Sequence, residues 1–132
     1  MASRVLIIEA DFNFRSSVAT HLRQAGFDIV TAADRASARA ILARRGVDVV
    51  LLGLGGLGAG GRQLLREIRA TWPRIRVITL NRNEQIELSI EAMRLGAFAD
   101  LMPPFELDAL RESVRAAAAG AADPSQSSGG IP

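Results

Sequence analysis

The chain has 132 residues, the length of one ordinary domain, and 48% of them are hydrophobic, which is enough for a buried core. It contains no cysteine, which excludes disulfides and thiolate metal sites, and no apolar run approaches the ~20 residues of a membrane span. The formal net charge is only +2, and the basic residues are scattered among acidic ones, so we expect no nucleic-acid-binding patch.

Short apolar runs and helical spacings alternate along the chain and predict five strand–helix units. The strands fall, in chain order, at residues 4–8, 27–32, 47–52, 76–80 and 98–102. The helix after each strand is marked by apolar residues at helical spacing, in chain order Phe14, Val18 and Leu22, then Ala38, Ile41 and Leu42, then Leu64, Leu65 and Ile68, then Ile86, Ile90 and Met93, then Leu107, Leu110 and Val114. Asp34 is expected to cap the second helix, and Gly26, Gly46 and Gly96 to end the first, second and fourth.

Apolar strands that alternate with helices indicate an α/β fold, in which helices cover both faces of a parallel sheet. Five strands in about 120 residues suit the flavodoxin-like (βα)5 fold with strand order 2-1-3-4-5. Its crevice lies at the carboxyl ends of the first and third strands, so we expect any chemistry just after Ile8 and Leu52. Residues 1–119 form the predicted domain, and residues 120–132, which have no apolar period, are expected to be a flexible tail or the start of a linker.

The glycine-rich stretch at residues 51–61, LLGLGGLGAGG, admits two interpretations. Gly53, Gly55 and Gly58 spell G-x-G-x-x-G, the spacing that lets a dinucleotide pyrophosphate approach a helix N-terminus, and Arg82 after the next strand would suit a ribose phosphate. The other interpretation is that a functional side chain is missing from the end of the third strand. A short glycine motif outside the first strand–helix unit is weak evidence for a cofactor.

Several stretches together resemble the receiver domain of bacterial two-component response regulators, over residues 4–119. They are VLIIEAD, GFDIVTAAD, DVVLLGL, VITLN, EAMRLGA and PPFELDAL. The resemblance implies signal transduction through a phosphoryl group on an aspartate that ends the third strand. It also implies Mg²⁺ held by that aspartate and an acidic pair, a hydroxyl residue and a lysine that bind phosphoryl oxygens, and an aromatic switch residue.

This sequence departs from the receiver pattern at nearly every one of those positions. The phosphoacceptor position falls on Gly53, the acidic pair on Glu9 and Ala10 with Asp11 next, and the hydroxyl, aromatic and lysine positions on Asn81, Asp100 and Pro103. The chain contains no lysine at all. Two carboxylates supply too few oxygens for a tight magnesium site. The resemblance therefore predicts a pseudo-receiver that holds neither metal nor cofactor and transfers no phosphoryl group.

The roles of the carboxylates that follow the first strand are left open by the sequence. Glu9 and Asp11 are expected to be solvated, although a salt bridge with an arginine or a bound cation is also compatible with them. His21, the only histidine, is expected on the surface, and Trp72 at the edge of the core. No serine or threonine has the setting of a catalytic nucleophile, so we expect no enzyme activity.

Mixed charges on the fourth and fifth helices form a candidate interaction face, made of Glu84, Glu87, Glu91, Arg94, Arg111 and Arg115. The alternative is ordinary surface charge on two helices. The expected partners are a signalling protein, histidine kinase or output domain, or a second copy of the chain, in the cytoplasm and without membrane or nucleic acid. The competing function is nucleotide binding through residues 53–61, and a third is an active receiver whose acceptor has moved.

Overall fold

The structure, a computed structural model, describes residues 2–44, 46–57, 59–82, 85–102 and 106–120. Five parallel strands form one sheet in the order β2-β1-β3-β4-β5, which confirms the predicted topology. The strands are β1 (Arg4–Ile8), β2 (Asp28–Ala32), β3 (Val49–Gly53), β4 (Arg76–Leu80) and β5 (Ala99–Leu101). The helices are α1 (Phe12–Gln24), α2 (Arg35–Ala43), α3 (Ala59–Thr71), α4 (Ile86–Arg94) and α5 (Leu107–Ala118), with a short 3₁₀ helix, η1 (Gly55–Leu57), before α3.

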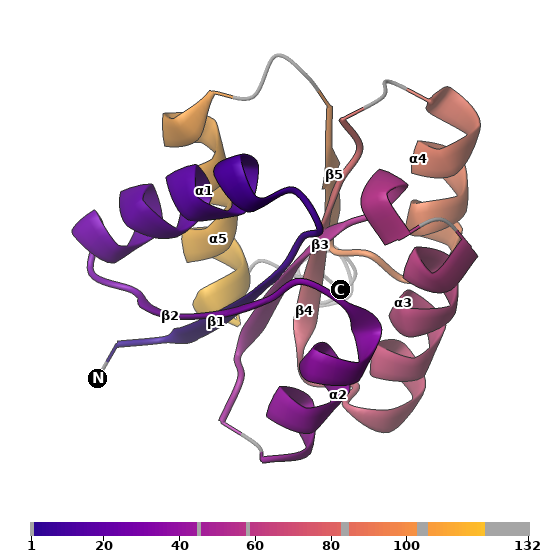
Figure 1. Cartoon of the computed structure of the whole chain (residues 1–132), viewed down its shortest axis with the longest axis horizontal. Coiled ribbons are helices and arrows are strands. Elements are labelled where there is room, and N and C mark those ends of the chain that lie inside the picture. The colour runs from indigo at the N-terminus through magenta and orange to yellow at the C-terminus, as the bar shows by residue number, and fades with distance from the viewer. Residues whose placement is uncertain (1, 45, 58, 83–84, 103–105, 121–132) are drawn as a thin grey trace, which may run out of the picture.

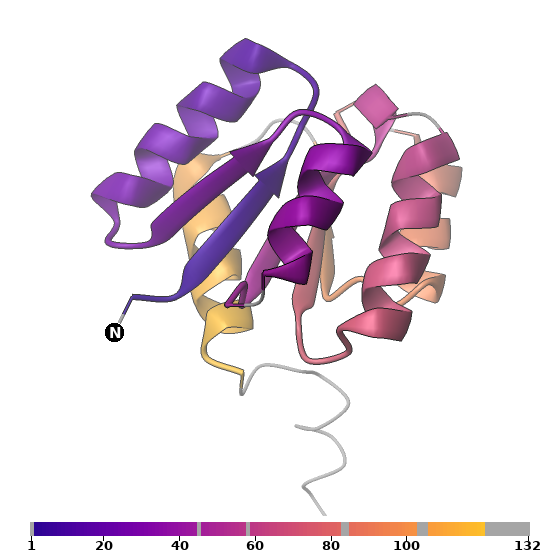
Figure 2. The same cartoon turned by 60° about the horizontal axis from the view of Figure 1, so that its bottom comes forward.

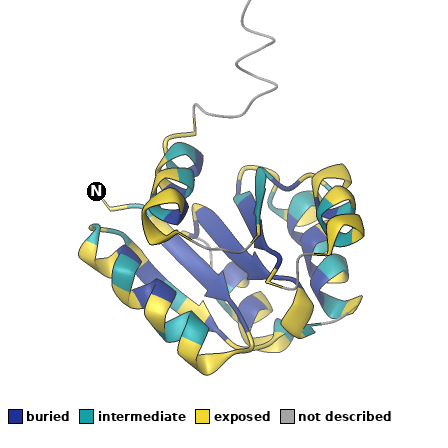
Figure 3. Cartoon of the chain, turned by 90° about the horizontal axis from the view of Figure 1, so that it is seen from above, coloured by how far each residue is buried: buried dark blue, intermediate teal, exposed yellow. Residues whose placement is uncertain are grey.

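Helices cover the sheet on both sides, with α1 and α5 on one face and α2, α3 and α4 on the other (Figures 1 and 2). Alternate residues of each strand serve the two faces: Val5 and Ile7 of β1 pack toward α1 and α5, whereas Leu6 and Ile8 pack toward the other layer. Figure 3 shows the strands as a buried layer between partly exposed helices. Burial on both faces explains why the strands are nearly continuous apolar runs.

Two helices begin at aspartate caps. Asp34 accepts a hydrogen bond from the backbone N–H of Ser37 at 2.8 Å, as predicted, and Asp11 does the same for Phe14 at 2.9 Å. The three glycines that were expected to end helices have φ values of +97°, +91° and +99° at Gly26, Gly46 and Gly96. These values lie in the left-handed region that glycine adopts at low cost, so the helix stops are confirmed.

The strand bounds differ from the prediction by one or two residues. β3 begins at Val49 rather than residue 47, because the side chain of Asp48 accepts the backbone N–H of Arg4 at 2.9 Å just before the ladder starts. It also runs on to Gly53, which pairs with Leu80. β2 loses its first predicted residue, and β5 keeps only three, because it is an edge strand that pairs with β4 alone.

The fourth helix is present, but its apolar stripe faces outward. Ile86, Ile90 and Met93, the α4 stripe, are 67%, 47% and 49% exposed. The helix packs on the sheet through its opposite side, where Ala92 is buried and Leu88 and Leu95 contact the core. Apolar stripes of surface helices normally face the core, so the exposure of this one is a departure from the expected pattern.

Four predicted features lie outside the described residues. They are the third fingerprint glycine at Gly58, the charge at Glu84, the lysine position at Pro103, and the tail beyond Gly120. Among the described helices, none is long and apolar enough to cross a bilayer.

Candidate functional site

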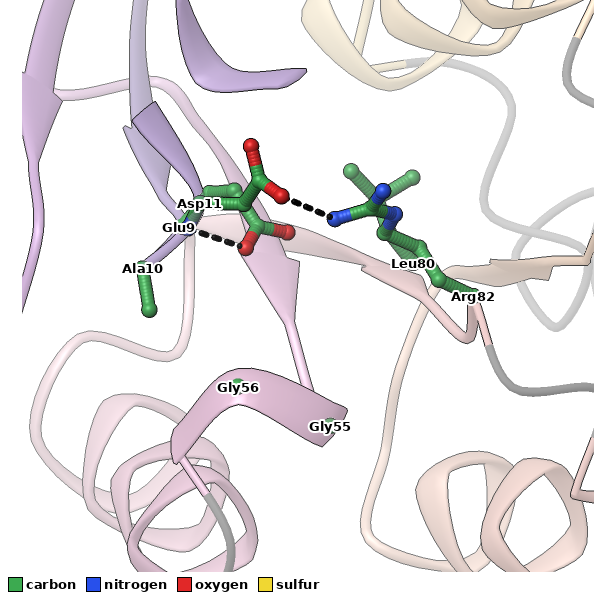
Figure 4. Close-up of a pocket in the computed structure, with 7 residues that line it drawn as sticks. All are labelled: Glu9, Ala10, Asp11, Gly55, Gly56, Leu80 and Arg82. Carbon is green, nitrogen blue, oxygen red and sulfur yellow. Dashed lines mark hydrogen bonds and ion pairs between the residues drawn. The ribbon is translucent and has the colours of Figure 1, made fainter. Parts of the chain in front are cut away.

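The carboxyl ends of β1, β3 and β4 meet at a pocket of about 510 Å³ (Figure 4). The parallel sheet brings these ends to one edge, as the fold class predicts. The pocket is lined by Glu9, Ala10, Asp11, Gly55, Gly56, Leu80 and Arg82. Gly53, the last residue of β3, lies directly beneath the carboxylate of Glu9 and belongs to the same site.

Glu9 is buried, with only 3% of its surface exposed, so the expectation of a solvated carboxylate is wrong for this residue. Its Oε2 atom accepts a hydrogen bond from the backbone N–H of Asp11 at 2.9 Å. The guanidinium of Arg15 donates at 2.7 Å to the backbone carbonyl of Glu9, which fixes the turn between β1 and α1. The side chain is therefore held over the end of the sheet instead of extending into water.

The space beside Gly53 is filled by Glu9. A Cβ atom on Gly53 would come within 2.9 Å of the Glu9 carboxyl carbon, closer than real Cβ contacts allow. Every larger side chain at position 53 would have to displace the glutamate. The end of the Glu9 side chain would therefore have to shift to admit even an alanine, whereas the φ of Gly53 is not among the left-handed values of the described glycines.

Asp11 performs two structural tasks. Besides capping α1, its Oδ2 atom forms an ion pair of 3.2 Å with Nη1 of Arg82, which follows β4 (Figure 4). The guanidinium of Arg82 also lies 4.4 Å from the ring centroid of Phe14, a cation–π distance. The backbone hydrogen bond from Phe14 and then the Arg82 side chain lower the pKa of Asp11. Of the alternatives for this residue, the structure supports the salt bridge.

Glycine positions in the loop after β3 also contact the β1 end. A Cβ on Gly56 would come within 3.0 Å of the Ala10 side chain and 3.5 Å of Glu9 Oε2. Residues 55–57 form η1, so this part of the glycine stretch is a 3₁₀ turn packed against the acidic end of β1. Gly58, the third glycine of the candidate fingerprint, lies outside the described residues.

A second polar group joins β4, β5 and α4. Asp100 accepts hydrogen bonds from the hydroxyls of Thr79 and Ser89, one on each carboxyl oxygen. Asn81 donates through Nδ2 to Ser89 Oγ at 2.9 Å and to the backbone carbonyl of Gln85 at 2.6 Å. Thr79 and Asn81 are buried. The two positions that the resemblance assigns to the hydroxyl and aromatic switch residues are thus linked through Ser89 and hold α4 against the sheet.

The candidate interaction face is divided by the sheet. Glu87, Glu91 and Arg94 lie on α4, and Arg111 and Arg115 lie on α5, which packs on the opposite face. The α5 arginines pair within their own helix, with Asp108 and Glu112 at 3.5 to 3.8 Å, as expected for ordinary surface charge. Glu91 pairs with Arg62 of α3 at 2.9 Å.

His21 and Trp72 both stand at the boundary between core and solvent. The side chain of His21 is 21% exposed and faces α5, with Nε2 4.0 Å from Asp108 Oδ1, so it is a partly covered surface residue. The α1 helix turns that residue toward its neighbour rather than toward water. Trp72 packs partly buried against the core, which confirms its position at the core edge.

The residues present do not fit the magnesium ion that the receiver pattern implies. Gly53 offers no ligand, Asp11 is paired with Arg82, and Ala10 replaces a carboxylate. Within the described part of the chain, no group of three or more histidine, aspartate and glutamate side chains is placed to bind a metal. A guanidinium group supplies positive charge at this edge of the sheet instead.

The double role of Asp11 leads to a prediction about stability. Asp11→Ala removes both cap and ion pair and should lower the free energy of unfolding, whereas Asp11→Asn keeps a capping oxygen and should lower it less. Because the folded-state pKa is lowered, the carboxylate stabilises the fold above its ordinary pKa of about 3.9, and this contribution is lost as the pH falls through the lower folded value.

Urea unfolding at neutral and acidic pH measures these effects. Asp34→Asn is the matched control, because Asp34 caps α2 with a pKa lowered by the Ser37 backbone and no arginine partner is involved in that shift. An Asp11→Asn variant that is as unstable as Asp11→Ala would contradict the expectation that the cap of α1 contributes more to stability than the ion pair with Arg82.

The sequence indicates a role for Arg82 only as a phosphate ligand, and it contains no pattern that predicts the role of Ser89. Arg82 is separated from Asp11 by most of the chain, and Ser89 was an unremarkable residue on the side of a helix. Their contacts depend on the sheet bringing β1, β4 and β5 together, which no local pattern encodes.

Comparison with known proteins matches residues 5–115 to the response regulator receiver domain. Response regulator protein FleR of Pseudomonas aeruginosa is 31% identical over 131 residues, which are 99% of this chain and 28% of FleR. Sporulation initiation phosphotransferase F of Bacillus subtilis is 25% identical over 115 residues, 87% of this chain and 93% of that protein. The chain therefore spans about a quarter of FleR but nearly all of the Bacillus protein.

Solved structures agree with the sequence match. The crystal structure of NtrX from Brucella abortus superposes with a TM-score of 0.84 and 28% identity, covering all of this chain and 30% of NtrX. A response regulator from Thermotoga maritima superposes with a TM-score of 0.82 and 25% identity, over 90% of this chain and 99% of that one. With the family match over residues 5–115 and the strand order 2-1-3-4-5, the chain belongs to the response regulator receiver domain family.

Proposed function

We propose that this receiver domain signals without phosphoryl transfer and acts as a protein-interaction module. The observation that carries the proposal is the contact between Glu9 and Gly53. Receiver domains accept the phosphoryl group at the position of Gly53, and here that position has no side chain, while the Glu9 carboxylate lies against the place where a Cβ atom would stand. The buried glutamate occupies the space into which an acceptor would project.

The charges around the pocket support the same proposal. Phosphoryl transfer requires cationic or hydroxyl donors aimed at the equatorial oxygens and a divalent cation to neutralise them. This chain has no lysine to serve as a donor. Arg82 is engaged by Asp11 and Phe14, and Asn81 donates to Ser89 and Gln85. An incoming phosphoryl group would meet the carboxylates of Glu9 and Asp11 instead, which repel it.

The hydrogen bonds of Asp100 give this module a fixed surface. Because Asp100 and Asn81 both bond to Ser89, α4 is tied to the sheet in one position. The signal is then the presence or availability of a partner, such as a histidine kinase, an output domain or a second copy, rather than a chemical change in the pocket. The domain so proposed comprises residues 1–119, acts in the cytoplasm, catalyses no reaction and binds neither membrane nor nucleic acid itself.

Nucleotide binding through residues 53–61 receives no specific support from the contacts. Four glycines of this stretch, Gly53, Gly56, Gly60 and Gly61, face side chains or backbone of Glu9, Ala10, Arg35 and Leu54 rather than an open phosphate cradle. Glu9 lies beside Gly53 and Gly56, where a pyrophosphate would need backbone N–H donors and no competing negative charge. We therefore retain the interaction module as the proposed function.

Incubation with acetyl phosphate and Mg²⁺ tests the proposal. We expect the intact mass of the protein to remain unchanged, because position 53 supplies no nucleophile and the chain has no lysine. A receiver domain that keeps its acceptor aspartate, treated in parallel, is the positive control. A stable phosphoryl adduct on this chain, mapped to any aspartate or glutamate of the pocket, would overturn the proposed function.

A further inference from the structure

A second pocket lies at the end of the sheet opposite Glu9 and Gly53. It has a volume of about 480 Å³, within the range of small-molecule sites, and its lining residues come from two connections, α2 to β3 and α3 to β4. Figure 1 shows the C-terminal ends of α2 and α3, where these connections begin, at the lower edge of the molecule. The receiver positions that the structure describes do not line this pocket, so the proposed function gives it no role.

The lining of this pocket is largely apolar. Leu42 at the end of α2, Val47 before β3 and Ile75 before β4 all line it and are only 1%, 8% and 7% exposed. Trp72 also lines it and packs partly buried against the core. A ligand with a flat apolar body would bury its surface against these four side chains, and that burial is the main favourable contribution to binding.

The wall that contains Trp72 is held in place by hydrogen bonds within the protein. The guanidinium of Arg69 donates through Nη1 to the backbone carbonyl of Pro73 at 3.2 Å and to that of Ile75 at 3.1 Å. The backbone N–H of Ile75 donates to the carbonyl of Trp72 at 3.0 Å. Because this turn is ordered without a ligand, binding does not have to supply the cost of ordering it.

The charge at the pocket favours an anionic ligand. Arg74 is its one charged lining residue among those described, is exposed, and forms no ion pair with another described residue. The C-terminal ends of α2 and α3 bring partial negative charge to this edge, but Arg69 in the last turn of α3 already balances that helix. The indole N–H of Trp72 also donates to no residue of the described ranges, and it supplies a second donor on this wall.

We propose that this pocket binds a small monocarboxylate with a flat apolar body. The apolar body lies against Leu42, Val47, Trp72 and Ile75, and the carboxylate pairs with the guanidinium of Arg74, whose planar group matches a carboxylate in geometry. A neutral ligand of the same shape loses this ion pair, and a cationic one is repelled. The site goes beyond the proposed interaction module, because binding there uses none of the residues that surround Gly53.

Fluorescence of Trp72 measures this binding directly, because the chain contains one tryptophan and no tyrosine. The probe is 4-phenylbutyrate, with 4-phenylbutanol and 4-phenylbutylamine as its neutral and cationic counterparts. We expect 4-phenylbutyrate to change the emission with a dissociation constant of about 0.1 to 1 mM, which is ordinary for a ligand of about a dozen non-hydrogen atoms. The alcohol should bind about threefold to tenfold more weakly, and the amine more weakly still.

Acetate separates the contribution of the apolar body from that of the charge. It carries the carboxylate but has almost no apolar surface to bury against Trp72 and its neighbours. At the concentration that saturates the protein with 4-phenylbutyrate, acetate should leave the emission and the melting temperature unchanged. The saturating ligand should raise the melting temperature, since it binds the folded chain.

A charge reversal tests the role of Arg74. Arg74→Glu should weaken 4-phenylbutyrate about tenfold and should make 4-phenylbutylamine the tighter ligand. Arg66→Glu is the matched control, because Arg66 is an exposed arginine of α3 that does not line the pocket. The preference for the carboxylate should persist in Arg66→Glu. Both substitutions are at exposed positions, and melting curves establish that each variant is folded.

Three results would overturn the inference. The first is no change in emission or melting temperature with 4-phenylbutyrate up to about 10 mM. The second is equal affinity for the carboxylate and the alcohol, which would mean that Arg74 does not select the ligand. The third is a change of preference that is the same in Arg74→Glu and Arg66→Glu, which would show an effect of net charge rather than of this pocket.

Discussion

Gly53→Asp should lower the free energy of unfolding by about 3 kcal/mol or more and should still give no phosphorylated protein. The new side chain would collide with the Glu9 carboxyl group, which lies within 2.9 Å of where its Cβ would stand. It would also bring a second carboxylate to a buried one, and an uncompensated buried charge costs about 3–5 kcal/mol. Neither Ala10 nor Arg82 provides the metal ligation that would relieve this repulsion.

A double-mutant cycle separates the collision from the charge. Gly53→Ala should cost about 1–3 kcal/mol through overpacking alone, and most of that cost should vanish in a Glu9→Ala background. Gly60→Ala in α3 is the comparison variant: its Cβ would come within 2.8 Å of Cδ of Arg35, so it also overpacks, but no buried carboxylate is involved. Its cost should therefore be the same in the Glu9→Ala background.

Urea unfolding gives the stabilities, and intact-mass measurement after acetyl phosphate treatment gives the phosphorylation. A Gly53→Asp protein that is as stable as the parent and is phosphorylated efficiently would mean that Glu9 moves aside easily. A single substitution would then restore a working receiver. In that case the contact between Glu9 and Gly53 would no longer support the proposed interaction module.

Asp100→Ala should destabilise the protein by about 2–3 kcal/mol and should loosen α4. The substitution removes the acceptor of two hydroxyl groups, on Thr79 in β4 and Ser89 in α4. Thr79 is fully buried, so its hydroxyl would keep only the backbone carbonyl of Ala99 at 3.4 Å, at the limit of a hydrogen bond. A buried donor left without an acceptor costs about 1–3 kcal/mol.

Hydrogen exchange distinguishes the role of Asp100 in placing α4 from a general loss of stability. Backbone amides of α4 should exchange faster in Asp100→Ala by more than the global change explains, while those of α1 and α5 should follow global unfolding. Asp108→Ala on α5 is the control, because its side chain is 78% exposed and the expected change is within about 0.5 kcal/mol. Replacing Thr79 by valine as well should recover part of the loss, because the buried Thr79 hydroxyl that lacked an acceptor is then gone.

Equal exchange in α4 and α5 for the Asp100→Ala variant would contradict the proposal that these hydrogen bonds fix the signalling surface. It would leave Asp100 as a contributor to stability without a specific effect on α4.

Residue identity and spacing alone were enough to predict the architecture and the missing acceptor aspartate. Apolar runs and helical spacings predicted all five strands and five helices. The strands are continuous apolar runs because both faces of the parallel sheet are buried, and the helices repeat apolar residues at intervals of three and four. The missing acceptor at Gly53 and the absence of lysine could also be read directly, since they depend on residue identity alone. Helix ends at Gly26 and Gly46 followed from the backbone conformation that glycine favours.

The roles of the acidic and polar residues depend on contacts between elements that are distant in the sequence. Glu9 was expected in water, because isolated carboxylates normally are, yet it is buried against Gly53, which lies 44 residues away in the sequence. The partners of Asp11 and Asp100 come from other strands and helices, and such contacts depend on how the sheet assembles. The α4 stripe illustrates the same limit: periodicity established that α4 has an apolar side, but only packing showed that Leu88, Ala92 and Leu95 reach the core and Ile86, Ile90 and Met93 do not. A periodic pattern specifies the faces of a helix, and the neighbouring elements decide which face is buried.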